Sequence, residues 1–344
     1  MAYERISRYK AHFDTQQDLR PILTSLNSDN SWLLSLPRPV SERKASSKAY
    51  FHLVHDPWLN GPEVQVSPWL IYLSLSSTPA VTDGAGVDRL VRKIEGAAAD
   101  AGFISKVKEA VSEDRAAIDA IVINFHYGDH LHAPTLLTFD PQIPIFTTSD
   151  GAPIISKLNH FANITTYPDL SPNFLGDWSA YVTIPGLPPY LTLFRIKGHH
   201  ELNFLTALLW QSAPKTWEAI LHSPHGLHTN TPALQSLLAH GGPRFSTLAL
   251  LHGLKESWTW GWQTTFGAKT GLELFRLSGA RYWVSTHNDR LGYGGLVWWL
   301  VTDVFRTVEW ALGQEKTTSE GVEGVGMKEA RVHEVGNGGV IVLE

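Results

Sequence analysis

The chain has 344 residues, of which 43% are apolar and 18% are charged, which is typical of a globular protein and excludes a disordered one. Its net charge of −5 argues against a large nucleic-acid surface, and no apolar run is long enough to span a membrane. Because the chain has no cysteine, disulfides, thiolate nucleophiles and cysteine-ligated zinc are excluded.

The first half of the chain begins with a polar stretch, residues 1–30, that has a weak helical pattern and reads as an N-terminal extension. It lacks the apolar centre of a signal peptide, so we expect a cytoplasmic protein. Short apolar runs bounded by turn residues predict strands over residues 31–39, 49–59, 66–77, 117–125 and 143–148. Apolar residues spaced three and four apart predict helices over residues 83–117, 135–139 and 152–158.

The second half repeats this order of strands first and strand–helix alternation afterwards. Strands are predicted over residues 180–185, 191–198, 204–210, 217–223, 245–253, 280–289 and 338–344. Helices are predicted over residues 231–240, 269–278 and 296–312, with a Trp-rich loop over 256–266 and a flexible linker over 315–330 before the closing strand. The repeated order predicts a pseudo-duplicated α/β sandwich that forms one domain over residues 1–344.

Polar side chains gather at four predicted strand ends, where α/β folds usually carry their sites. Asp56 follows LVH, Asp129 and His130 follow the run AIVINF, His225 and His228 lie in SPHGLH, and His287 lies in STHND. The stretch NFHYGDHLH, residues 124–132, is the densest of these, because it also contains His126 and His132. These strand ends are therefore the candidate site.

The order of these segments resembles the metallo-β-lactamase superfamily over residues 30–310. The similar segments are the strand before DPW, the strand before Asp129-His130, DPQIPIFTT with APIISKL, and YWVSTHND. In detail the chain is similar to divergent fungal members, related at a distance to lactonase-like hydrolases. The resemblance implies a four-layer αββα sandwich with a metal site at the strand ends.

The superfamily's metal loop reads H-x-H-x-D-H, in which the first two histidines bind one metal and the final Asp-His pair a second. When Asp129 and His130 are aligned with that pair, Phe125 and Tyr127 occupy the positions of the first two histidines. His126 lies between them and would need a one-residue bulge to replace either. A conventional dinuclear zinc site is therefore not expected.

By the resemblance, one zinc ion would be held by Asp129, His130 and His287, with His225 at the position of the usual bridging Asp. Either His199 or His200 matches the superfamily's middle histidine, and Asp56 matches a residue that orients the metal loop. If the metal is not bound by His225 or His199, either is a candidate general base. Tyr127 would add a phenol to the pocket.

Structural alternatives stand beside these roles. The Asp129-His130 pair is also a reasonable cap for a helix that starts near Pro134. The alternating Trp258, Trp260 and Trp262 predict one face of an extended segment, which is either a flap packed on the core or a wall of an apolar substrate pocket.

The function expected from the sequence is metal-dependent hydrolysis of an ester, lactone or related bond in an apolar small molecule, with a reduced, mononuclear site. The alternatives are a non-catalytic or metal-free sandwich that acts as a binding protein, and a lyase or isomerase that uses histidine and tyrosine as acid and base. The sequence gives no reason to expect a nucleic-acid, membrane or protein partner, and it leaves the oligomeric state open.

Overall fold

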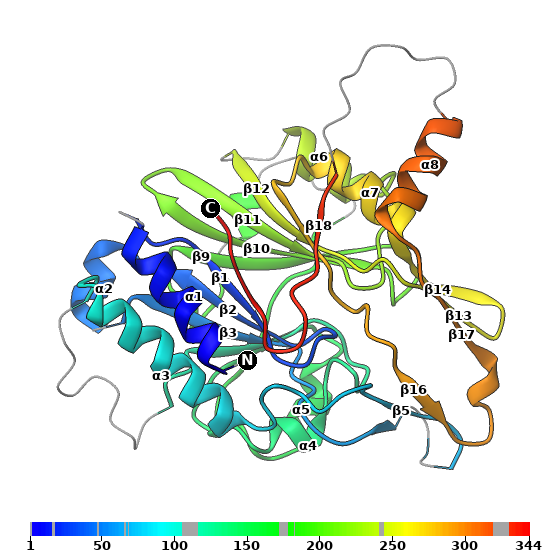
Figure 1. Cartoon of the computed structure of the whole chain (residues 1–344), viewed down its shortest axis with the longest axis horizontal. Coiled ribbons are helices and arrows are strands. Elements are labelled where there is room, and N and C mark those ends of the chain that lie inside the picture. The colour runs from blue at the N-terminus through cyan, green and yellow to red at the C-terminus, as the bar shows by residue number, and fades with distance from the viewer. Residues whose placement is uncertain are drawn as a thin grey trace.

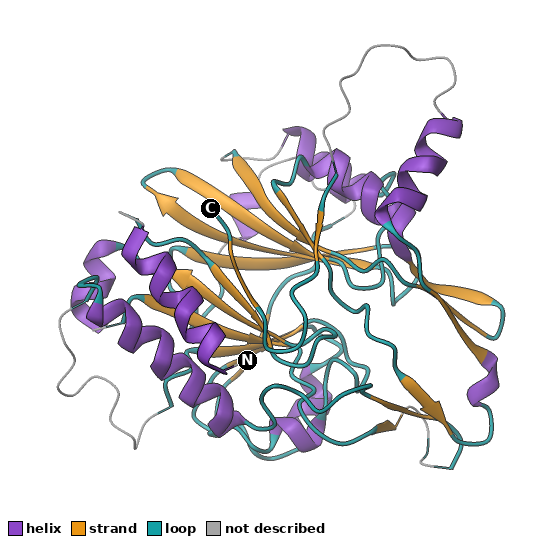
Figure 2. Ribbon diagram, in the orientation of Figure 1, coloured by secondary structure: helices purple, strands orange, loops and turns teal. Residues whose placement is uncertain are grey.

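Two large β-sheets lie face to face in the computed structural model, with helices on their outer surfaces (Figures 1 and 2). The structure describes residues 2–15, 18–46, 48–64, 67, 69–104, 116–171, 178–181, 183–240, 244–318 and 330–344. Within these ranges, no helix combines the length and apolar character that crossing a bilayer requires.

The first sheet has the strand order β19-β1-β2-β3-β6-β7-β8 among the described residues. Pairing is antiparallel from β19 to β3 and parallel from β3 to β8. The strands are β1 (Ile22–Ser25), β2 (Trp32–Pro37), β3 (Tyr50–His55), β6 (Ala120–Ile123), β7 (Ile145–Thr147), β8 (Ile164–Thr166) and β19 (Val340–Val342).

The second sheet repeats this topology, with the order β18-β15-β12-β11-β10-β9 among the described residues. Pairing is antiparallel from β9 to β11 and parallel from β11 to β18. The strands are β9 (Leu191–Lys197), β10 (Phe204–Ala213), β11 (Thr216–His222), β12 (Phe245–Leu251), β15 (Tyr282–Val284) and β18 (Val332–His333). The predicted duplication is therefore present, and β3 and β11 are equivalent strands in the two halves.

Helices cover the outer face of each sheet, which gives the four layers. The helices are α1 (Ala2–Thr15), α2 (Val40–Ser46), α3 (Gly84–Asp100), α4 (Ala133–Leu136), α5 (Ala152–Ser156), α6 (Pro232–His240), α7 (Gly267–Ser278) and α8 (Val308–Thr318), with 3-10 turns η1 (Trp178–Tyr181) and η2 (Trp298–Leu300). One apolar cluster joins α1 and α3 to the first sheet, a second fills the space between the sheets, and a third joins α6 and α7 to the second sheet.

Helix α3 shows how the sequence produces this layering. The Asp83 side chain accepts a hydrogen bond from the Gly86 N–H at 2.6 Å and caps the helix. Val87, Leu90 and Ile94 lie on one face at helical spacing and are buried against the sheet. The predicted helical region extends further, but residues 105–115 lie outside the described ranges.

Two small sheets project from the sandwich as an arm (Figure 1). One has the order β14-β13-β17, with β13 (Glu256–Thr259), β14 (Trp262–Phe266) and β17 (Val301–Val304). The other has the order β16-β5-β4, with β4 (Glu63–Val64), β5 (Tyr72–Ser74) and β16 (Gly292–Gly294).

The arm corrects two predictions. The expected loop over 256–266 is a hairpin that turns at Trp260 and Gly261, whose φ values are 56° and 79°. The expected helix over 296–312 is instead η2, then β17, then α8. The second error arises because a short apolar run fits a buried helix and a strand equally well until its pairing partner is known.

Smaller differences concern the predicted strand 180–185 and the two ends of the chain. The predicted strand 180–185 is wrong, because η1 covers Trp178–Tyr181 and the segment that follows runs into Pro185, which has no N–H for a sheet ladder. Residues 1–30 are more than an extension, since β1 lies inside the seven-stranded sheet. The closing strand is confirmed as β19, and residues 319–329 of the predicted linker lie outside the described ranges.

Some tryptophans are buried and others are exposed, and substitution of a buried one should destabilise the protein far more than substitution of an exposed apolar residue. Trp283 on β15 is fully buried, stacks on Phe275, and donates its Nε1–H to the His252 carbonyl at 3.0 Å. Trp283→Ala is expected to lower the free energy of unfolding by about 3–5 kcal/mol, measured by urea denaturation. Val40→Ala, at a 63% exposed position on α2, is the control and should cost less than about 0.5 kcal/mol. Equal losses would contradict this assignment of the core.

Candidate metal centre

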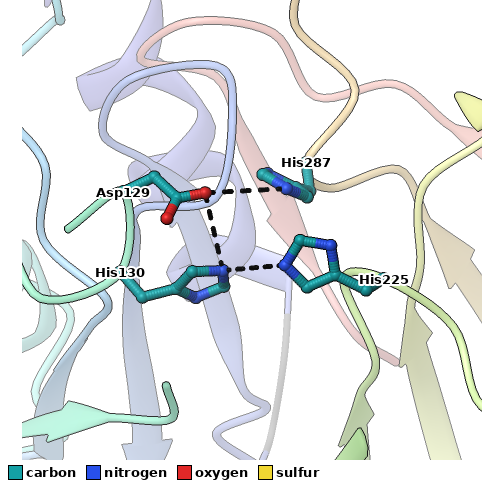
Figure 3. A group of neighbouring side chains, drawn as sticks. All are labelled: Asp129, His130, His225 and His287. Atoms are coloured by element: carbon teal, nitrogen blue, oxygen red, sulfur yellow. Dashed lines mark hydrogen bonds and ion pairs between the residues drawn. The ribbon is translucent and has the colours of Figure 1, made fainter. Parts of the chain in front are cut away.

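Four side chains from three strand-end loops meet between the two sheets (Figure 3). Asp129 and His130 follow β6, His225 follows β11, and His287 follows β15. One ligand atom from each lies within 4.8 Å of the other three, and all four residues are buried. The structure therefore brings together the pair predicted from the loop, the predicted last histidine and His225.

The distances describe an inward-facing donor set. Nε2 of His130 lies 3.2 Å from Nε2 of His225, and Oδ2 of Asp129 lies 3.9 Å from Nε2 of both His130 and His287. Three imidazole nitrogens and one carboxylate oxygen match the number and chemistry of ligands that a tetrahedral zinc ion takes.

Each histidine ring is oriented by a hydrogen-bond partner at Nδ1, on the side of the ring away from the site. The Nδ1 atom of His130 lies 2.7 Å from Asp56 Oδ2, and that of His287 lies 2.9 Å from Asp29 Oδ2. Nδ1 of His225 lies 3.0 Å from Thr265 Oγ1 on β14. When Nδ1–H donates to such a partner, the Nε2 lone pair faces inward, as a metal ligand requires.

The backbone at these loops is unusual. Asp56 and His287 have φ values of 42° and 51°, in the left-handed region that residues other than glycine seldom adopt. Both loops are bound to the loop between β1 and β2. The His287 N–H donates to the Asp29 carbonyl at 2.9 Å, and the Asn30 amide donates to Asp56 Oδ2 at 3.0 Å. Such conformations persist where the surrounding contacts determine them, and they gather at functional sites.

The charges of the site favour one protonated and one neutral imidazole. Burial disfavours protonation of His130, but the neighbouring carboxylates, above all Asp129 and Asp56, raise its pKa to about 9. Burial and the nearby imidazoles of His287 and His130 hold the pKa of His225 well below its ordinary value. A divalent cation would take the place of the His130 proton among these carboxylates.

Asp29 was missed by sequence reasoning. Burial alone would raise the pKa of its carboxyl, but His287 and Lys255 reverse this and lower it to about 2. Asp29 and Asn30 lie between β1 and β2 in the polar run SLNSDNSW, which reads as an exposed turn. Both are buried at 1% exposure, and nothing in the local pattern distinguishes them from ordinary turn residues.

Glu63 is a second missed residue. Its carboxyl lies so close to the Cα of Gly128, next to Asp129, that a Cβ at position 128 would come within 1.7 Å of Glu63 Oε1. Burial and the neighbouring Asp129 raise the pKa of this carboxyl to about 7. A side chain at position 128 would displace the Glu63 carboxyl, which is the second carboxyl beside the ligands.

An apolar cluster occupies the position of the two missing histidines. Phe125 packs on Leu202 and Phe204, and the Phe125 and Phe204 rings stack with centroids 5.5 Å apart. Tyr127 is packed against this cluster, and its hydroxyl donates to Glu201 Oε1 at 2.7 Å. These side chains offer no imidazole or carboxylate ligand at that place.

The remaining predicted residues lie elsewhere. His199 and His200 are exposed in the turn between β9 and β10 and are not members of the four-residue group. His126 is half-buried, and His132 rather than Asp129 caps α4, since its ring accepts a hydrogen bond from the Thr135 N–H. The capping alternative for Asp129 is therefore wrong. Trp258, Trp260 and Trp262 are 36%, 69% and 75% exposed on the arm, on two strands and a turn rather than one extended segment.

A second buried group, His55, Asp56 and His222, lies at the ends of β3 and β11. The Asp56 oxygens already accept hydrogen bonds from His130 Nδ1, the Asn30 amide and the Asn124 N–H. His222 Nε2 donates to Asn30 Oδ1 at 2.8 Å, and a cavity of about one water molecule lies beside the two rings. Through Asp56, this group holds the ring of His130 in place.

A neighbouring buried histidine gives the fold a pH dependence. Burial lowers the pKa of His252 to about 4, and its Nδ1–H donates to the Gly253 carbonyl at 2.7 Å. Since the unfolded chain binds this proton near pH 6.5, the unfolded state holds more protons between pH 6.5 and 4. His252 therefore stabilises the fold fully above pH 6.5 and loses on the order of 3 kcal/mol as the pH falls to 4.

The matched variant for this prediction is His252→Asn, whose amide can still donate to the Gly253 carbonyl. Urea unfolding at several pH values should show a shallower loss of stability in the variant than in the wild type between pH 6.5 and 4. Parallel pH curves for the two proteins would show that His252 does not titrate in this way.

The comparisons with known proteins agree with this architecture. No protein-family model matches the chain, and no curated protein matches it. A structure from Veillonella parvula DSM 2008, described as a possible metal-dependent hydrolase, is 10% identical, with a TM-score of 0.50 over 95% of this chain and 100% of the other.

Two further solved structures are similar at lower scores. The metallo-β-lactamase fold protein YhfI from Bacillus subtilis is 10% identical over 94% of this chain and all of its own, with a TM-score of 0.46. An isothiocyanate hydrolase from Delia radicum gut bacteria is 13% identical over 77% of this chain and 84% of its own, also with a TM-score of 0.46. At such identities a likeness shows the fold alone. With the four layers and strand-end site described above, the chain has the metallo-β-lactamase fold.

Proposed function

We propose that this protein is a mononuclear metal-dependent hydrolase that acts on an ester, lactone or related bond in an apolar small molecule. The observation that supports it is the donor set, in which three histidines are held by Asp56, Asp29 and Thr265 with Nε2 facing Asp129. A bound zinc ion would polarise a carbonyl and lower the pKa of water at this place.

The chain's own residues would then hold the ion and exclude bulk water. Asp129, His130, His225 and His287 are the proposed ligands, which leaves none of these four free to act as a base. Water or the substrate carbonyl would have to enter as a fifth ligand of the ion. The apolar cluster of Phe125, Leu202 and Phe204 lies against the ligands and would receive an apolar part of the substrate. Tyr127, joined to Glu201, borders this cluster and would orient the substrate by its phenol.

Glu63 is the proposed group for proton transfer. Its carboxyl lies over Gly128 in the metal loop, on the short strand β4. A carboxyl at this place can give a proton to a leaving group and recover it from water. Glu63→Gln should lower the turnover number and leave the metal content unchanged.

The deciding experiment is metal analysis of protein purified without chelator, followed by assay against esters and lactones with apolar acyl chains. About one zinc ion per chain and hydrolysis that a chelator abolishes are the expected results. Less than a tenth of an ion per chain would end the proposal and leave a metal-free binding protein. One bound ion without hydrolysis of any substrate would support the metal centre and refute the reaction class.

A further inference from the structure

The arm carries a concentration of exposed aromatic side chains that the proposed site does not use. Among the described residues, six of the chain's 13 tryptophans are 36–75% exposed, and all six lie on or beside the arm strands β5, β13, β14, β16 and β17. We call this the aromatic face, and its tryptophans are Trp69, Trp260, Trp262, Trp298 and Trp299. Trp258 lies on the other side of β13, because its neighbour Thr259 is the residue that pairs with Trp262.

Backbone hydrogen bonds connect the segments that carry these residues. The Trp260 N–H donates to the Leu300 carbonyl, directly after Trp298 and Trp299. The Leu296 N–H donates to the Trp69 carbonyl, which fastens the second small sheet to the same segment. In Figure 1 both small sheets extend together, away from the two large ones.

The size of the aromatic face reaches or exceeds what a monomer ordinarily exposes. Since a tryptophan buries roughly 150–250 Å² when covered, the exposed parts of these five sum to roughly 500–800 Å². The largest apolar patch of a typical monomer measures about 300–600 Å². A stable protein–protein interface buries about 800 Å² on each partner, so the area approaches that of half a dimer interface.

The composition of the face is that of an interface core. Residues 257–264 and 291–302, which supply four of its five tryptophans, contain no Asp, Glu, Lys or Arg. Interface cores lack charged residues and are rich in tryptophan, tyrosine and phenylalanine.

The strand order favours a protein over a lipid surface. In the sheet β14-β13-β17, Trp262 lies on edge strand β14, and Trp298 and Trp299 directly precede edge strand β17. Edge strands present N–H and C=O groups that another strand can pair with. A lipid surface cannot satisfy these groups, whereas an edge strand can pair antiparallel with its own copy across a two-fold axis.

We propose that the aromatic face is the interface of a two-fold homodimer, with the arm of one copy packed on the arm of the other. The dimer would cover the exposed tryptophans and pair an edge strand of each copy. The arm also reaches the metal centre, because Thr265 on β14 contacts His225. The proposal does not depend on a bound metal or on hydrolysis.

The test is the mass of the full chain, measured by light scattering after size-exclusion chromatography over a dilution series. The wild type should have about twice the chain mass of 38.2 kDa above micromolar concentration, and should dissociate on dilution. The double variant Trp298→Glu, Trp299→Glu should be monomeric at every concentration. The control Val40→Glu, at an exposed apolar position on α2, should remain dimeric.

A second measurement needs no variant. Amide hydrogen exchange along β14 or β17 should slow as the wild-type concentration rises, because pairing protects an edge strand. A wild type of 38.2 kDa throughout would refute the homodimer, and so would a double variant that folds and stays dimeric. A monomeric wild type that sediments with phosphatidylcholine vesicles would show that the face binds lipid instead.

Discussion

His225→Ala is expected to lower the affinity for zinc by at least about 100-fold, because loss of the groups that merely orient a ligand already costs 10–100-fold. The variant removes one of the four proposed donors and leaves Asp129, His130 and His287. Competition with a chromophoric chelator measures the affinity directly.

His228→Ala is the matched control for this variant. His228 lies three residues further along the same loop, is exposed, and lies outside the four-residue group. Its loss should leave zinc affinity within about twofold, as for other surface substitutions. If His225→Ala binds zinc as tightly as the wild type, His225 is not a ligand, and the site would rest on Asp129, His130 and His287 alone.

Asp56→Ala is expected to lower the free energy of unfolding by about 3–5 kcal/mol, which is the usual cost of leaving a buried charge without its partner. Asp56 has no exposed surface and accepts hydrogen bonds from His130, Asn30 and the Asn124 backbone. The same variant should weaken zinc binding by about 10–100-fold, because His130 loses the partner that turns its ring.

Urea denaturation and zinc titration of one preparation measure both effects. Asp140→Ala is a suitable control, because this exposed carboxylate only accepts the Gln142 N–H within its turn. Its stability should change by less than about 1 kcal/mol. A stable Asp56→Ala protein that has lost zinc would mean that Asp56 serves the metal centre alone; unchanged zinc affinity would contradict its orienting role.

Much of the fold could be predicted from the sequence because its signals are local and periodic. The apolar stripe of α3 and the branched run of β6 each specify an element by themselves. The repeated order of strands and helices also predicts two equivalent halves, and this was confirmed by the two matching sheets. The arm was mispredicted, since VTDV within LVWWLVTDVF becomes a strand only by pairing with β13, more than 40 residues away in the sequence.

The residues of the candidate site that match the family's motif could be predicted from the sequence, whereas the residues that orient them could not. Asp129, His130 and His287 stand at matching positions, and His225 stands where an aspartate was expected. The residues that orient them have no local signature. Asp29 lies in a loop more than 250 residues before His287, and its burial results from the packing of two distant loops.

The duplicated topology has a consequence for how metal and fold depend on each other. Two of the four donors, Asp129 and His130, belong to the first half, and the other two, His225 and His287, belong to the second. An ion bound there would link the two repeats, because neither repeat alone supplies enough ligands to hold it. The free energy of metal binding would then stabilise the packing of the two halves against each other. Loss of a ligand in one repeat would therefore lower the stability of the whole fold.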